Sequence, residues 1–209
     1  MNHIKKEELS KYSKDLLTLY LLSSFNIGQD WDFDQKQAIL TYNAKLANNL
    51  GNLVNRVVVL ALKLSEKSWI LDNEYNEIDA DNIILFSDVE QFMDSNMKLY
   101  DLKSALDDNF KFLDILNKYT DTSEPWKLIK EDEIKTRVVL YTIAEWLRQV
   151  WLNLYTFFPK KMWKMFNKLW LENYSDLLEN WKLNELRIRK EIFKIKEKWE
   201  PLFKRIEIN

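Results

Sequence analysis

The polar residues with the most informative spacing lie between positions 42 and 57. Apolar side chains recur there at the spacing of one helix face, while Lys45, Asn49, Asn52 and Arg56 fall within a narrow arc of the other, with Asn48 at its margin. Asparagine is a poor helix former, so several on one arc run against helix propensity. Its amide donates and accepts hydrogen bonds, as reading an unpaired base requires. The commoner alternative is that these amides bond neighbouring helices or face water.

A second candidate for recognition is Trp126, which directly follows Pro125 at a predicted break between helices. An indole placed at such a break can stack on an extruded base. Lys127 and Lys130 follow and are candidates for contacts with phosphate. The competing interpretation, favoured by the residue type alone, is an ordinary core tryptophan.

The composition excludes most classes of enzyme. Of 209 residues, 46% are hydrophobic and 31% charged, with no cysteine, one histidine (His3) and two glycines. These counts exclude disulfides, thiolate sites, a Ser-His-Asp triad, an HExxH site, a P-loop and a Rossmann fingerprint. A net charge of -2 argues against a broad nucleic-acid-binding face, although basic residues exceed acidic ones from Lys160 onward. No apolar run is long enough to span a membrane.

The periodicity predicts an all-α protein, an antiparallel helical bundle. Long helices are expected over the ranges 5–24, 34–64, 97–119 and 133–158. The range 65–88 reads as a polar connection, and shorter helical segments should follow Pro159. The predicted units are a first helix over 1–24, a bundle over 25–158 and a C-terminal helical tail over 159–209.

Several blocks of the sequence, in the same order along the chain, resemble the methionyl-tRNA synthetases. They are residues 26–33, 42–56, 117–119, 124–128, 145–148 and 200–207. The resemblance implies the anticodon-binding bundle of a class I synthetase, with methionine tRNA as its partner. In that family a tryptophan after proline stacks on the CAU anticodon, and Trp126 matches it.

The same resemblance implies that polar residues on a facing helix select the bases. Aligned without gaps, the family's polar pair falls near Lys45 and Asn49, whose types differ from it. Asn52 and Arg56 restore an Asn-x-x-x-Arg spacing on the same arc. The whole stripe, with Asn48, is therefore predicted to bind the anticodon. A helical scaffold without RNA binding, or the anticodon domain of another class I synthetase, are the alternatives.

Neither the HIGH nor the KMSKS signature of the family is present in this sequence. The resemblance therefore implies no cofactor for this chain, and ATP and Mg²⁺ only for a full-length enzyme. A catalytic half is expected in cis or in trans, joined through residues 1–24, in a cytoplasmic protein that binds neither membrane nor DNA. An apolar surface near Leu16, Leu19, Leu202 and Phe203 should then be left exposed by the absence of that half.

Tryptophan is abundant and glycine is rare, with nine and two residues respectively. Three tryptophans stand where the family pattern has glycine, namely Trp31, Trp170 and Trp199. Trp146 and Trp181 are plausible further cases. We hypothesise that the source organism reads UGA as glycine and that these positions are glycine codons, which would make them neither core nor binding residues. UGG codons at Trp31, Trp170 and Trp199 would refute the hypothesis.

Overall fold

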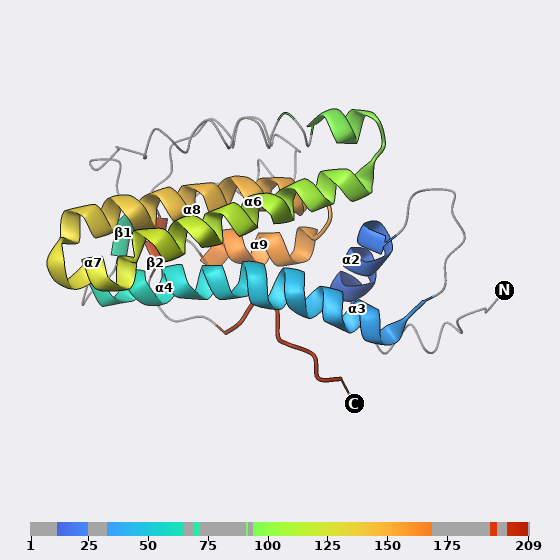
Figure 1. Ribbon diagram of the computed structural model, residues 1–209, viewed down its shortest axis with the longest axis horizontal. Helices are drawn as coiled ribbons and strands as arrows, with labels where there is room; N and C mark the ends of the chain where they lie inside the picture. The colour runs from blue at the N-terminus through green and yellow to red at the C-terminus, as the bar shows by residue number, and fades with distance from the viewer. Residues whose placement is uncertain are drawn as a thin grey trace.

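The computed structural model describes residues 12–24, 33–64, 69–71, 91, 94–168, 193–195 and 200–208. It confirms the predicted all-α bundle (Figure 1). The helices are α2 (Lys14–Ser24), α3 (Gln35–Tyr42), η1 (Asn43–Gly51), α4 (Asn52–Leu64), α6 (Leu102–Ser123), α7 (Pro125–Glu131), α8 (Glu133–Tyr155) and α9 (Pro159–Lys168). The segments α3, η1 and α4 follow one another as a single rod. Helices α6 and α8 pack against this rod and run antiparallel to each other.

Aspartates at the first positions set where the helices begin. Asp34 accepts a hydrogen bond from the backbone N–H of Gln37 at 3.0 Å, which makes it the N-cap of α3. Asp101 caps α6 and Asp132 caps α8 in the same way. Each carboxylate satisfies a backbone N–H that the first helical turn leaves without a partner.

The segment η1 is a nine-residue π-helix, where the sequence predicts an ordinary α-helix. Its hydrogen bonds run from residue i to i+5, so each turn holds more residues and side chains leave the arc that a 3.6-residue period assigns them. Gly51 closes the segment at a close approach, because a Cβ there would lie 3.1 Å from the carbonyl oxygen of Leu46. The π-helix therefore splits the predicted polar stripe between two directions.

The core contradicts the expected exposed apolar surface around the first helix. Leu16 and Leu19 are 0% exposed because α2 packs on α3 and α6. Phe203 is 2% exposed and meets the ring of Tyr42 edge-on at 6.3 Å, while Leu202 is half-buried. These side chains are covered by the chain itself. Among the described residues, no helix is long and apolar enough to cross a membrane.

Trp146 is a core residue of the protein with this sequence. Its side chain is 3% exposed, and its ring lies 5.6 Å from that of Phe112 and 5.7 Å from that of Tyr119. The glycine-codon hypothesis made this position neither core nor binding, so it would require these packing contacts to be absent from the natural protein. The other positions of that hypothesis, Trp31, Trp170, Trp181 and Trp199, lie outside the described residues.

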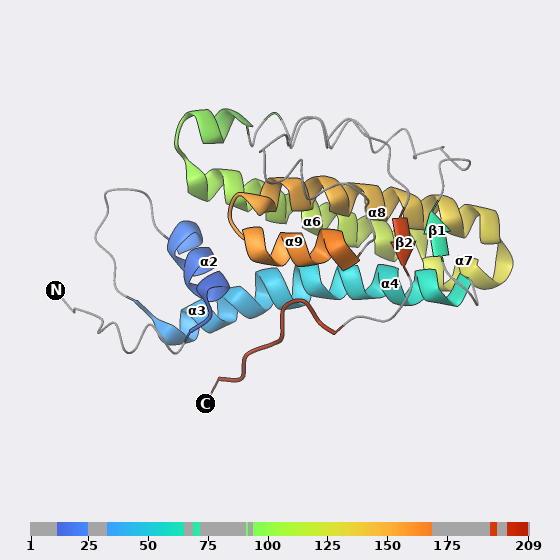
Figure 2. The ribbon, with the colours of Figure 1, turned by 180° about the vertical axis from the view of Figure 1, so that it is seen from behind.

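Two segments beyond the long helices differ from the expected pattern. The strands β1 (Trp69–Leu71) and β2 (Phe193–Ile195) pair antiparallel, with Trp69 opposite Ile195. The first of them falls in the predicted polar connection. The tail begins with α9, as expected, but residues 201–208 form no helix and run along the outer side of η1 and α4 (Figure 2).

Candidate nucleic-acid interface

The junction between α6 and α7 places Trp126 at the surface. Glu124 ends α6 in the left-handed region, with φ 43° and ψ 51°, and also caps α7. Pro125 occupies the first turn of α7, where its missing N–H costs nothing. This sharp turn leaves the Trp126 side chain 37% exposed. The interpretation of Trp126 as a core residue is therefore wrong.

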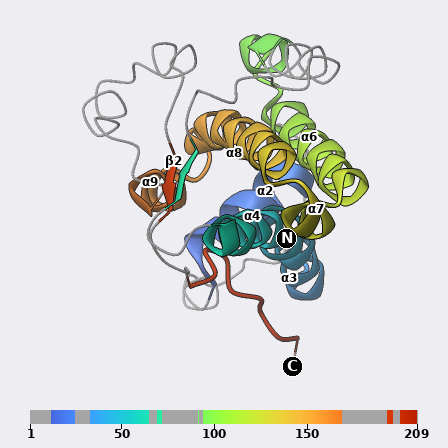
Figure 3. The ribbon, with the colours of Figure 1, turned by 90° about the vertical axis from the view of Figure 1, so that its left-hand side faces the viewer.

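Arg56 brings α4 to the same place. Its guanidinium carbon lies 5.1 Å from the centre of the Trp126 ring, within the range of a cation–π contact. Its Nη2 also lies 2.6 Å from a carboxylate oxygen of Asp121 on α6. Figure 3, viewed from the end that carries α7, shows this helix lying beside α4 and α6. The indole, the guanidinium and the carboxylate form one partly exposed cluster at this end of the bundle.

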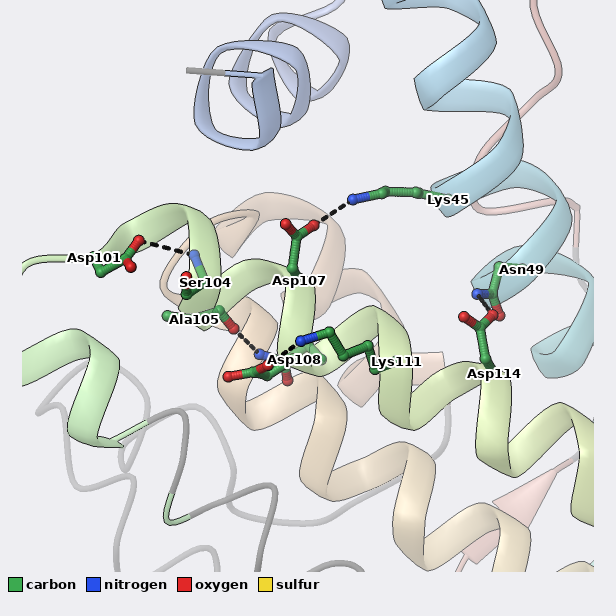
Figure 4. Close-up of polar contacts among 10 residues, drawn as sticks. Lys45, Asn49, Asp101, Ser104, Ala105, Asp107, Asp108, Lys111 and Asp114 are labelled. Atoms are coloured by element: carbon green, nitrogen blue, oxygen red, sulfur yellow. Dashed lines mark hydrogen bonds and ion pairs between the residues drawn. The ribbon is translucent and has the colours of Figure 1, made fainter. Parts of the chain in front are cut away.

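The part of the stripe on η1 is bound to α6 instead (Figure 4). The Lys45 ammonium lies 2.5 Å from Asp107, and the Asn49 amide donates to Asp114 at 2.7 Å. The Asn49 carbonyl oxygen also accepts from the Asn117 amide at 2.6 Å. For Lys45 and Asn49 the alternative interpretation, bonding to a neighbouring helix, is the one that the structure supports.

The aspartates at 107, 114 and 121 were not singled out from the sequence, although their spacing contains the signal. Positions seven residues apart share one helix face, so this acidic row could have been read as the partner of the basic and amide residues on the preceding helix. It compensates the charges of Lys45 and Arg56 along the seam between η1–α4 and α6.

Asn48 and Asn52 point away from that seam and are exposed. Both line a cavity of about 360 Å³ between η1, the start of α4 and the tail. Its walls combine amides, one guanidinium and apolar groups: Ala47, Asn48, Gly51, Asn52, Asn55, Pro201, Phe203 and Arg205. A neighbouring cavity of about 650 Å³ shares Asn48 and Arg205. Amide donors and acceptors beside a guanidinium suit a polar planar ligand or an anion.

The two lysines after Trp126 are both exposed on α7. The Lys127 ammonium lies 2.6 Å from Glu124, but the two side chains are 60% and 44% exposed. Such an exposed pair contributes about 1 kcal/mol or less, so a phosphate can replace the carboxylate at little cost. Lys127 and Lys130 therefore remain candidates for phosphate contacts.

Known proteins resemble this chain over nearly its whole length. A family model described as tRNA synthetases class I (M) matches residues 2–58. The methionine–tRNA ligase of Fusobacterium nucleatum is 32% identical over 204 residues, covering 97% of this chain and 32% of the relative. That of Helicobacter pylori strain 26695 is 33% identical, covering 94% and 30%.

The fold agrees with that similarity. The free-state crystal structure of Mycobacterium tuberculosis methionyl-tRNA synthetase superposes with a TM-score of 0.78 at 20% identity, covering 93% of this chain and 39% of that one. The chain thus spans about a third of the length of the curated relatives that it matches. From the sequence similarity along its length, together with the shared helical fold, the chain belongs to the methionyl-tRNA synthetase family.

Proposed function

We propose that this chain is the tRNA-binding part of a methionine–tRNA ligase and recognises the CAU anticodon of methionine tRNAs. The observation that supports it most is the exposed Trp126 indole, placed against Arg56 where α4, α6 and α7 meet. Residues 25–158 would form the binding bundle, residues 1–24 the link to a catalytic half, and residues 159–209 its tail.

In the proposed mechanism a base extruded from the anticodon loop stacks on the Trp126 ring. Aromatic stacking of this kind contributes about 1–3 kcal/mol per base. Arg56 provides a cation and several N–H donors beside the ring, and Lys127 and Lys130 extend the positive charge along α7. The lysines would hold the phosphates while the ring and the amides contact the bases.

The geometry favours Asn52 and Arg56 as the base-selecting pair over Lys45 and Asn49. The side chains of Lys45 and Asn49 are engaged by α6, at 2.5 Å from Asp107 and 2.7 Å from Asp114. Arg56 is also paired with α6, but its partner Asp121 is 62% exposed whereas Asp107 is 29% exposed, so a ligand can replace the Asp121 carboxylate at lower cost. Asn52 is exposed one turn before Arg56, with Asn48 one turn further back in the same cavity wall. Their amides can meet a base without breaking the seam between helices.

The complete reaction, ATP-dependent joining of methionine to its tRNA, is what the relatives' names describe. In this proposal it needs a catalytic half in cis or in trans, because the HIGH and KMSKS signatures are absent from this sequence. ATP and Mg²⁺ would bind in that half. This chain's own residues would position the anticodon loop in a cytoplasmic translation enzyme.

A scaffold without RNA affinity is the competing function, and the acidic row on α6 favours it. Asp107, Asp114 and Asp121 stand beside the stripe and would repel phosphate that came close to the seam. The two functions are distinguished by titrating the chain with an anticodon stem-loop carrying CAU and with one in which the anticodon bases are exchanged.

We expect the CAU stem-loop to bind at least about tenfold more tightly than the exchanged one at physiological salt. Raising the salt should weaken both, because phosphate contacts release counterions. Equal affinity for the two RNAs would refute anticodon reading. Absence of binding to either would favour the scaffold.

A further inference from the structure

The C-terminal tail is held against η1 by hydrogen bonds to Asn43, the first residue of that helix. Asn43 is 6% exposed, and its amide Nδ2 donates to the carbonyl oxygen of Ile206 at 2.8 Å. The backbone N–H of Ile206 donates in return to Asn43 Oδ1 at 2.9 Å. One side chain thus satisfies both backbone groups of a residue 163 positions away in the sequence.

Other contacts hold the start of the tail. Lys161 on α9 donates to the carbonyl oxygen of Leu202 at 2.8 Å, and its ammonium lies 5.3 Å from the Phe203 ring. The carbonyl of Phe203 approaches the last residue of η1, at 4.0 Å from a Cβ built on Gly51. Since Asn43 meets residue 206 and Gly51 meets residue 203, the tail runs antiparallel to η1.

Because of this path the tail is the outer wall of the cavities that contain the exposed amides. Arg205 lines both cavities together with Asn48, and it lines the smaller one together with Asn52. We call the two hydrogen bonds between Asn43 and Ile206 the clamp. Because Arg205 lies directly before Ile206, the clamp fixes the position of the Arg205 guanidinium. Without the clamp, Phe203 still anchors the chain, but residues 205–208 lose their fixed position beside the amides.

We propose that Asn43 is a positioning residue for anticodon binding: it holds residues 205–208 against η1 and so gives the Asn48–Asn52 pocket its shape. This inference rests on the proposed function. It places a determinant of RNA affinity at a buried side chain on the far side of η1 from the α6 seam. Loss of the clamp should alter the Asn48–Asn52 pocket and leave the Trp126 stacking site unchanged.

Two variants remove the clamp from opposite sides. In Asn43→Asp the carboxylate still accepts from the Ile206 N–H but cannot donate to its carbonyl oxygen, which it repels. In Ile206→Pro the backbone N–H of residue 206 is lost. This substitution lies in the tail and not in the bundle, so it tests the clamp even if Asn43→Asp folds poorly. Glu200→Gln is the matched control, since Glu200 lies in the same tail, is exposed and lines neither of the two cavities.

We expect both clamp variants to bind the CAU stem-loop about tenfold more weakly, as the loss of roughly one hydrogen-bonded contact implies, and Glu200→Gln to bind as the wild type does. The backbone amide of Ile206, which donates to Asn43 in the wild type, should exchange faster with solvent in Asn43→Asp. The loss should be less than additive with Asn52→Ala, which alters the same pocket, and additive with Trp126→Leu.

The results separate the two proposals. A wild-type chain that does not distinguish CAU from an exchanged anticodon refutes the proposed function, and this inference with it, before any variant is made. A discriminating wild type with unchanged affinity in both clamp variants overturns the inference alone. A loss in Asn43→Asp that Ile206→Pro does not reproduce also overturns it, because the effect would then be local to η1.

Discussion

Replacing Trp126 by leucine isolates the stacking that we propose for its ring. Leucine keeps an apolar side chain between α4 and α7 but offers no aromatic face. Because the indole is 37% exposed, an accessible ring is available to a base in the wild type. At about 1–3 kcal/mol per stacked base, Trp126→Leu should weaken binding of the CAU stem-loop by about 5-fold to 150-fold, and Trp126→Phe by less.

The effect on folding must be kept apart from the effect on binding. Truncation of a fully buried tryptophan to alanine costs about 3–5 kcal/mol, so at this exposure Trp126→Ala should cost roughly 2–3 kcal/mol, including the contact with Arg56. Trp126→Leu should cost less. Affinity is measured by fluorescence anisotropy, and unfolding by denaturant titration followed by circular dichroism.

Trp163→Leu is the matched control, because this half-buried tryptophan lies on α9, away from α7 (Figure 3). It should change the free energy of unfolding and leave RNA affinity unchanged. Wild-type affinity in Trp126→Leu would refute the stacking role. An equal loss in Trp163→Leu would show that the assay reports general destabilisation.

Three further predictions concern charge, backbone strain and pH. Asp121→Asn should change the free energy of unfolding by less than about 1 kcal/mol, because the carboxylate is 62% exposed. It should tighten RNA binding by up to about fivefold at low salt, because it removes a negative charge beside Arg56. Unchanged affinity would contradict this. Glu124→Gly should leave stability within about 1 kcal/mol, since relief at φ 43° offsets the added freedom of the unfolded chain, whereas Glu124→Ile should lose about 1–3 kcal/mol in thermal denaturation. Burial, with a smaller contribution from Asp15, raises the pKa of Tyr42 from 10.0 to about 12. The unfolded chain then releases this proton at lower pH than the folded one, so stability should fall by up to about 2.7 kcal/mol as the pH rises from 10 to 12, a slope that Tyr42→Phe should remove.

Local features were predictable because they depend on neighbouring residues. Asp34 and Gln37 supply a cap and its N–H, so the start of the second long helix could be placed from four residues of sequence. Pro125 prevents continuation of α6 and predicts the break that exposes Trp126. The helical periodicity of the apolar residues likewise sufficed for the all-α fold.

The partners of the polar stripe could not be predicted in this way. A 3.6-residue period places Lys45, Asn49, Asn52 and Arg56 on one arc, but the π-helix changes the angle between successive side chains. As a result Lys45 and Asn49 meet α6, whereas Asn52 faces the tail. The periodic pattern contains no information on which helix will lie alongside.

The sequence by itself determined the helices, the break before Trp126 and the family resemblance, since each is encoded by residues close together in the chain or by their order along it. Tertiary structure alone decided which polar groups are occupied and which remain exposed. Asn43 bonds Ile206 and Arg56 bonds Asp121 across 163 and 65 positions. Such pairings exist only once packing has brought the segments together, because buried polar groups must find partners wherever the fold supplies them.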